Sequence, residues 1–194
     1  DPYSSLNPRM TVREIVEEGM CNYNIGANRA ERDQMIRKIL EQVGLKEDAM
    51  GAYPHEFSGG QRQRIGIARA LTLKPKLIVC DEPVSALDVS IQAQVVNLLQ
   101  DLQSRLGIAY LFITHNIAVV EYLAHDVSVM YLGRIVEQGS VEEVLRAPRH
   151  PYTKALLAEA PRLDQRQRAF EPIVGEIPSP LDPPPGCHFN PRCP

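Results

Sequence analysis

The N-terminal part of the chain places apolar residues at helical spacing. Thr11 precedes Val12, Ile15 and Val16, which predicts a short helix with Thr11 as its N-cap. A second helix is predicted from about Ala30 to Val43, and Gly44 ends it. A third helical pattern begins within "FSGGQRQRIGIARAL", residues 57–71, where two glycines follow a serine.

The middle of the chain predicts a strand, a helix and a second strand. "KLIVCDEP" is an unalternating apolar run, which predicts a strand buried on both faces of a parallel sheet and ended by Pro83. From Ser90 to Leu106, apolar residues recur every three or four positions, as expected for an amphipathic helix, and Gly107 closes it. "IAYLFIT" predicts the next strand.

The remaining pattern continues the alternation of helices and strands. A short helix is expected from Ile117, then two strands, "DVSVMYL" and "RIVEQG", around Gly133, and a helix from Ser140 to Pro148. This order predicts an α/β fold with a mostly parallel sheet. Eight of the sixteen prolines lie beyond Glu171, so we expect an extended C-terminal tail that is not densely packed.

Composition narrows the class of protein. The 194 residues are 44% apolar, enough for a hydrophobic core. The net charge is −3 and the basic residues are scattered, so no nucleic-acid partner is indicated. No apolar run approaches the ~20 residues of a membrane span and no signal peptide is evident, which predicts a soluble cytoplasmic chain. Cys21 and Cys80 are expected to be reduced thiols.

The first candidate for chemistry is the Ser-Gly-Gly-Gln stretch. A helix N-terminus offers unpaired N–H groups to a phosphate, and Gly59 and Gly60 leave the approach open. Ser58 can cap the helix or give its hydroxyl to the phosphate, and Gln61 adds an amide donor. For Ser-Gly-Gly alone, a glycine-rich turn before an ordinary helix is the simpler interpretation.

Two further candidates lie at the carboxyl ends of predicted strands, where open α/β sheets bind ligands. Asp81 can hold Mg²⁺ through its water shell, and Glu82 can polarise the water that attacks a phosphoryl group. An acidic turn that caps the next helix is the alternative. His115 ends the second strand, where a histidine by itself is usually structural, and Asn116 is a candidate helix cap.

Taken in order, "FSGGQ", "LIVCDEP", "SALD" and "FITH" resemble the ATP-binding-cassette ATPases, the nucleotide-binding subunits of ABC transporters. The resemblance implies a P-loop-class α/β ATPase domain that uses ATP and Mg²⁺. It also implies that residues 58–61 form the signature motif, which contacts the γ-phosphate of ATP held by the opposite subunit. The other implied roles are Walker B magnesium residue for Asp81, catalytic base for Glu82, switch histidine for His115, and a D-loop across the dimer interface from Ser85 to Asp88.

One family motif is missing. The sequence has no G-x-x-x-x-G-K-[ST] and no Gly-Lys dipeptide, so the phosphate-cradling loop is absent. The opening "DPYSSLNPRMTVREIV" resembles the stretch that follows the family's magnesium-binding Gln, which favours truncation. We therefore expect the isolated chain neither to bind ATP tightly nor to hydrolyse it, whereas the full-length subunit does both.

The C-terminal part resembles one branch of the family. "LRAPRHPYTKALLAEAPR" and "PPPGCHFNPRCP" are similar to the extension of oligopeptide and dipeptide importer ATPases, a group that includes nickel and glutathione importers. The implied domains are an ATPase domain over 1–145, with a helical subdomain at about 10–72, and the extension over 146–194. Cys187 and Cys193 are too few for a closed metal site, although some members of the group hold an iron–sulfur cluster there.

The resemblance implies an ATP-hydrolysing subunit on the inner face of the cell membrane that powers uptake of oligopeptides or dipeptides. Its implied partners are a second ATPase subunit, identical or paralogous, two transmembrane permease subunits and an extracytoplasmic substrate-binding protein. The alternatives are an ABC-type ATPase of translation or DNA repair, a nickel or glutathione importer, and a regulatory relic without a phosphate loop. Arg62, Arg64 and Arg69 are interpreted as a solvated face with interface pairs, not as a nucleic-acid site.

Overall fold

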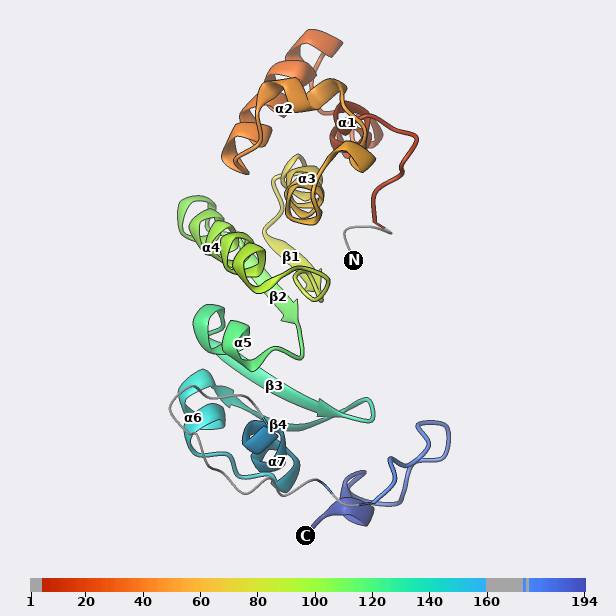
Figure 1. The fold of residues 1–194 in the computed structure, drawn as a ribbon, viewed down its shortest axis with the longest axis vertical. Coiled ribbons are helices and arrows are strands. Elements are labelled where there is room, and N and C mark those ends of the chain that lie inside the picture. Colours follow the sequence, from red (N-terminus) through yellow and green to blue (C-terminus); the bar gives the residue numbers. More distant parts are fainter. Residues whose placement is uncertain (1–4, 160–172, 174) are drawn as a thin grey trace. The chain divides into compact units, whose positions relative to one another are not determined.

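The computed structural model describes residues 5–159, 173 and 175–194. The chain divides into two compact units, Asp1–His115 and Asn116–Pro194, and each is described by itself (Figure 1). The division at residues 145 and 146 that the resemblance implies stays a prediction.

Helices dominate the start of the first unit. They are α1 (Val12–Asn22), α2 (Arg29–Gln42) and α3 (Gly59–Leu71), with two short 3₁₀ turns, η1 (Glu47–Gly51) and η2 (Pro54–Glu56), between α2 and α3. The three predicted helices are confirmed. Thr11 caps α1 in a capping box with Glu14, as its sequence position predicts. The apolar faces of these helices meet in a core whose fully buried members are Val12, Ile15, Val16, Met20, Ile36, Leu40, Val43, Ile65 and Ala68.

A network of ion pairs joins α1 to α2. Arg13 contacts Glu17 and Asp33, and Arg32 contacts Glu17, each at 2.6 Å. Glu17 is buried. Burial raises the pKa of the Glu17 carboxyl, but hydrogen bonds from Arg32 and Arg13 outweigh it and the net pKa lies below the ordinary value. The network therefore holds an ionised carboxylate between two helices.

The basic residues of α3 bind backbone carbonyls. Arg62 donates through Nε to the carbonyls of Pro54 and Phe57, at 2.8 and 3.0 Å. Arg64 donates to the carbonyl of Val43 at 2.7 Å, and Arg69 to that of Ser5 at 3.0 Å. All three arginines are half-buried, so the predicted solvated face is wrong. The guanidinium groups tie α3 to the segments before it.

A strand, helix and strand complete the first unit: β1 (Leu77–Asp81), α4 (Val89–Leu106) and β2 (Ala109–Ile113). The two strands are parallel, with Leu77 opposite Ala109 and Asp81 opposite Ile113, and α4 is the crossover that parallel pairing requires. Gly107 ends α4 with φ +65°, the left-handed backbone that glycine favours.

The prediction that β1 is buried on both faces is wrong for this chain. Exposure along β1 alternates: Cys80 is 8% exposed, whereas Val79 is 58% exposed. Because the strands pair in register, the exposed side chains of both gather on one face, formed by Leu77, Val79, Leu111 and Ile113. This apolar face is bare among the residues that the structure describes.

The second unit is built on a hairpin. It contains α5 (Ile117–Leu123), β3 (Asp126–Tyr131), β4 (Arg134–Ser140), α6 (Val141–Arg146) and α7 (Pro151–Glu159), followed near the C-terminus by the 3₁₀ turn η3 (Asn190–Arg192). The strands β3 and β4 are antiparallel, and Leu132 and Gly133 both have positive φ, as in a tight two-residue turn. Ser140 caps α6, as predicted.

The end of the tail is packed, contrary to the expectation for it. Phe189 is 1% exposed and its ring centroid lies 5.3 Å from that of Tyr131 and 5.4 Å from that of Tyr152. His188 is also buried, and its Nδ1 lies 3.2 Å from the Leu132 carbonyl. The burial of Phe189 against these two tyrosines thus holds the proline-rich end of the chain in place. The predicted extension also includes residues 160–172, which lie outside the described residues.

Candidate functional site

The Ser58–Gln61 segment forms the first turn of α3. Ser58 is the N-cap: its Oγ accepts the Gln61 N–H at 3.4 Å, while Gln61 Oε1 accepts the Ser58 N–H at 2.9 Å. The sequence left open whether Ser58 caps the helix or serves a ligand, and the structure shows that it caps. Both side chains are exposed.

The capping box does not use the side-chain hydrogen-bond donors of its two residues. Ser58 and Gln61 use acceptor oxygens in it, so the serine hydroxyl proton and the glutamine NH₂ group remain. The N–H groups of Gly59 and Gly60 belong to the first helical turn, which has no intrahelical acceptor for them. Four donor groups of three kinds therefore surround one helix N-terminus, as an anionic ligand requires.

Glu82 directly follows β1 in a constrained backbone. Its φ is +44°, which is left-handed and uncommon for a residue other than glycine. Its N–H donates to the Ile113 carbonyl at 2.9 Å, and its own carbonyl accepts the Ser85 hydroxyl at 3.1 Å. The turn that contains Ser85 thus fixes the direction in which Glu82 leaves the strand.

His115 lies against Glu82. The His115 Nδ1 and the Glu82 Oε1 are 3.0 Å apart, and because a carboxylate only accepts, the proton of this bond is on Nδ1. This hydrogen bond is the main reason that the pKa of the Glu82 carboxyl is lowered. The parallel register brings the ends of β1 and β2 to one edge, so two residues far apart in sequence form one pair.

Asp81 ends β1 at the same edge and is exposed. Its carboxylate makes no hydrogen bond or ion pair with the part of the chain that the structure describes. A free carboxylate suits Mg²⁺, which takes one or two protein oxygens and fills its other positions with water and substrate phosphates. The residue present therefore fits the predicted role.

Asp88 has a structural role that the sequence analysis did not assign to it, and its predicted role in the loop between subunits stays a prediction. It is the N-cap of α4, and its Oδ1 accepts the Ile91 N–H and the Ser90 hydroxyl, both at 2.9 Å. The hydrogen bond from Ile91 is the largest cause of its lowered pKa. Sequence reasoning placed Ile91 only among the apolar positions of the predicted helix, although its position three residues after an aspartate is typical of the first turn of a capped helix.

The cysteine tail does not fit a metal cluster. Cys187 Sγ lies 3.6 Å from His150 Nε2, and Cys193 Sγ lies 3.8 Å from the carbonyl oxygen of Pro194. Within the described ranges, no group of three or more His, Cys, Asp or Glu side chains could hold a metal ion. An iron–sulfur cluster is usually held by four cysteines, so the described residues do not support one.

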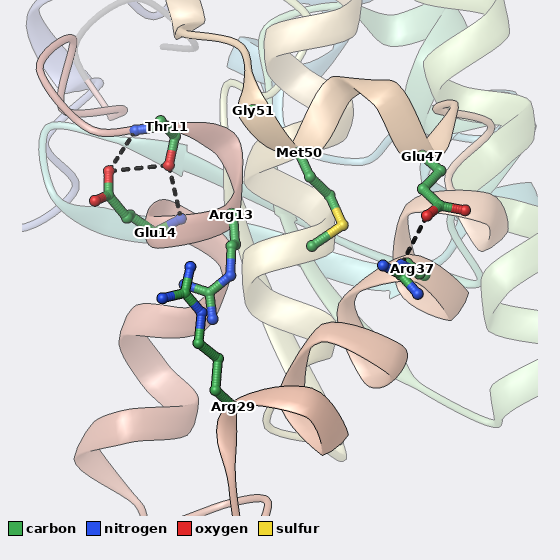
Figure 2. A pocket seen from close by; sticks show the side chains of 8 residues that line it. All are labelled: Thr11, Arg13, Glu14, Arg29, Arg37, Glu47, Met50 and Gly51. Carbon is green, nitrogen blue, oxygen red and sulfur yellow. Dashed lines mark hydrogen bonds and ion pairs between the residues drawn. The ribbon is translucent and has the colours of Figure 1, made fainter.

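A pocket of about 450 Å³ lies elsewhere, between the ends of α1 and α2 and the turn η1 (Figure 2). Most of its charged side chains pair with neighbours: Glu14 with Thr11, Arg37 with Glu47 at 2.8 Å, and Arg13 with the interhelical network. It contains none of the predicted site residues. The candidate chemistry is therefore not in this pocket.

Family comparisons agree with the motifs. The ABC transporter model matches residues 2–85, and the model described as "Oligopeptide/dipeptide transporter, C-terminal region" matches residues 136–194. The chain belongs to the ABC transporter family. Cassette motifs and the importer-type C-terminal region thus occur in one chain.

Proteins similar in sequence have names that describe peptide transport and ATP binding. The oligopeptide transport ATP-binding protein OppF of Escherichia coli is 53% identical over 197 residues, which cover 100% of this chain and 59% of OppF. A Brucella ovis protein, whose name describes peptide import and ATP binding, is 60% identical over 195 residues, which are 100% of this chain and 61% of that protein. The chain thus spans about 60% of the length of these relatives.

A solved structure supports the fold. The cbiO1 protein of Clostridium perfringens, part of the ABC transporter complex cbiONQ, matches with a TM-score of 0.66 and 31% identity over 76% of this chain and 57% of that one. This confirms the α/β cassette fold, with the parallel pair β1 and β2 in the present chain. Among the described residues no helix is long and apolar enough to cross a membrane.

Proposed function

We propose that this chain is the C-terminal part of the ATP-hydrolysing subunit of an ABC importer for oligopeptides or dipeptides. The observation that carries the ATPase proposal is the Glu82–His115 hydrogen bond of 3.0 Å at the edge where Asp81 stands free. Peptide as cargo is supported by the importer-type match over residues 136–194 and by the names of the relatives.

In this proposal each residue has a distinct task. Glu82, a carboxylate that the His115 hydrogen bond keeps ionised to lower pH than usual, accepts a hydrogen bond from the attacking water and orients it. His115 holds the carboxylate in place through Nδ1. Asp81 would hold Mg²⁺, and the ion would neutralise charge on the phosphates. Ser58, Gly59, Gly60 and Gln61 donate to the γ-phosphate of ATP on a second ATPase subunit, with Ser85 and Asp88 in the loop between the two subunits.

The rest of the assembly is proposed in the same way. Two ATPase subunits, two transmembrane permease subunits and an extracytoplasmic substrate-binding protein would form the importer at the inner face of the cell membrane. The bare apolar face of Leu77, Val79, Leu111 and Ile113 would be covered by the part of the subunit that precedes Asp1. Two observations support such a part: the relatives are longer than this chain, and the opening stretch resembles the one that follows the family's magnesium-binding Gln.

The test uses the complete subunit, joined to its native upstream sequence and its permease partners. Glu82→Gln should lower ATP turnover by 100-fold or more, which is the order of a lost general base, while ATP binding persists. Glu142→Gln is the matched control, because that glutamate is 75% exposed and, among the described residues, pairs only with Arg146 on its own helix. Unchanged turnover in Glu82→Gln would refute the role of Glu82.

Cargo is tested separately, in vesicles that contain the assembled importer. Uptake of a labelled tripeptide that requires ATP and stops in the Glu82→Gln variant supports peptide import. Uptake of nickel or glutathione without peptide uptake would assign the chain to the other importers with this extension. Failure to associate with any permease would favour an ATPase of translation or DNA repair.

A further inference from the structure

Gly60 lies under α4. It is buried, and a Cβ built on its backbone would come within 2.4 Å of the Ile91 Cγ2. Carbon atoms in favourable contact stand about 3.5–4.0 Å apart. The hydrogen atom of Gly60 therefore occupies a space in which no side chain fits, and that space is bounded by the first turn of α4.

Ile91 cannot easily move away. Its Cγ2 is bonded directly to Cβ, and a β-branched side chain in a helix has one strongly preferred χ1 rotamer. A shift of the whole of α4 would disturb Val95, Leu99 and Leu102, which are all buried. A shift of α3 would likewise disturb Ile65 and Ala68. The contact is thus fixed from both sides.

The contact also joins two of the motifs. Gly60 belongs to the Ser58–Gln61 segment, and Ile91 donates its N–H to Asp88, which caps α4 at the end of the Ser85–Asp88 loop. Ile91 therefore contacts the start of α3 with its side chain and the end of that loop with its backbone N–H. We infer that Ile91 is a positioning residue that sets the Ser58–Gln61 segment against the Ser85–Asp88 loop, and that Gly60 is glycine because of this contact.

The inference rests on the proposed function only for its effect on activity, because the contact itself can be tested in the 194-residue chain. Gly66 provides a matched control, since it lies in the same helix and a Cβ there would meet nothing within 4 Å. The variants are Gly60→Ala, Gly66→Ala, Ile91→Ala and the double variant Gly60→Ala/Ile91→Ala, each followed by thermal unfolding.

Gly60→Ala should lower the unfolding midpoint by roughly 5 °C, from overpacking, whereas Gly66→Ala should leave it unchanged or raise it. In the Ile91→Ala background, Gly60→Ala should lower the unfolding midpoint by less than about half of what it does in the wild type, because the added methyl group then fills the space left by Cγ2. An equal fall of the unfolding midpoint in both backgrounds, or no fall from Gly60→Ala, overturns the inference that Ile91 requires a glycine at position 60.

The positioning role is tested by ATP turnover of the complete subunit. Ile91→Val keeps a Cγ2 methyl group and should keep turnover within about 2-fold of wild type, whereas Ile91→Ala should lower kcat by about 10-fold with little change in KM. Gly60→Ala should lower kcat at least as much as Ile91→Ala does. The double variant should regain most of the kcat that Gly60→Ala loses. Turnover that stays lost while stability recovers would mean that a ligand, not Ile91, requires the glycine.

The two proposals fail in distinguishable ways. A wild-type complete subunit that does not hydrolyse ATP refutes the proposed function, and the unfolding cycle still decides whether Ile91 and Gly60 are coupled. An active wild type with full turnover in Ile91→Ala overturns the positioning role alone.

Discussion

The helical region of residues 11–71 and the strand edge that carries Glu82 and His115 belong to the same unit but are built in opposite ways. In the helical region the charged Glu17 is buried between two arginines, and helix starts are capped. At the strand edge the Glu82 and His115 side chains are 48% and 73% exposed, and the neighbouring sheet face is bare and apolar. The difference indicates that the helical region is stabilised within this chain, whereas the strand edge is arranged to meet other groups.

The largest effect is expected where a charge is buried. Glu17→Gln keeps the shape of the side chain but removes the charge that Arg13 and Arg32 share, so unfolding should become easier by about 2 kcal/mol. Urea unfolding at neutral pH measures this. Asp101→Asn is the control, because the Asp101–Arg105 pair is exposed and a change below about 0.5 kcal/mol is expected.

The same variant has a defined pH dependence. The pKa of Glu17 is lowered in the folded protein, so its stabilising contribution is present above the ordinary value of 4.5 and is lost as pH falls through the folded value. The difference between wild type and Glu17→Gln should therefore shrink in acid. A constant difference across that range would contradict the lowered pKa.

A smaller loss is expected from the capping residue of α3. Ser58→Ala removes the oxygen that accepts the Gln61 N–H, and unfolding should become easier by about 1 kcal/mol. Ser58→Asn is the matched control, since asparagine is an equally good N-cap and should restore most of the loss. If Ser58→Ala leaves stability unchanged, the capping box does not hold the start of α3.

A gain is expected at the strand edge. Glu82→Gly should stabilise the 194-residue chain by about 0.5 kcal/mol, because glycine adopts φ +44° without a steric penalty. Glu82→Gln retains the penalty and should leave stability unchanged. Glycine and glutamine variants of equal stability would show that the backbone of Glu82 is not strained. A gain in stability with the loss of the proposed base would mean that this residue is kept for function.

The smallest effect is expected on the bare sheet face, and it sharpens the comparison most. Val79→Thr should change the stability of the 194-residue chain by less than about 0.5 kcal/mol, since Val79 is 58% exposed. In the complete subunit the same change should cost clearly more, because the proposed upstream part would bury the hydroxyl without a partner. Equal effects in both proteins would mean that this face stays uncovered.

Local patterns predicted the helices well, whereas burial and contacts across the fold could not be predicted from them. Thr11 and Gly107 act on their own neighbours, so their positions in the sequence are sufficient to predict a cap and a helix end, whereas for Ser58 the cap was one of two alternatives. The exposure of Val79 depends on what packs against β1, which an apolar run cannot reveal.

Non-local pairs show the same limit. Glu82 and His115 were each predicted from strand ends, but their hydrogen bond follows from the parallel register. The contact between Gly60 and Ile91 has no signal in the sequence, because it depends on how two helices cross. Phe189 was likewise hidden by the prolines around it, although its aromatic partners Tyr131 and Tyr152 are what bury it.

The arginine at the start of α3 has a mechanical consequence. Besides the two carbonyls that its Nε reaches, Arg62 donates through Nη2 to the His55 carbonyl at 3.5 Å, so one guanidinium binds three carbonyls of the segment 54–57. A lysine, with its single nitrogen, cannot reproduce this planar fork. A displacement of α3 would therefore also displace residues 54–57, and the segment and the helix would move as one rigid body.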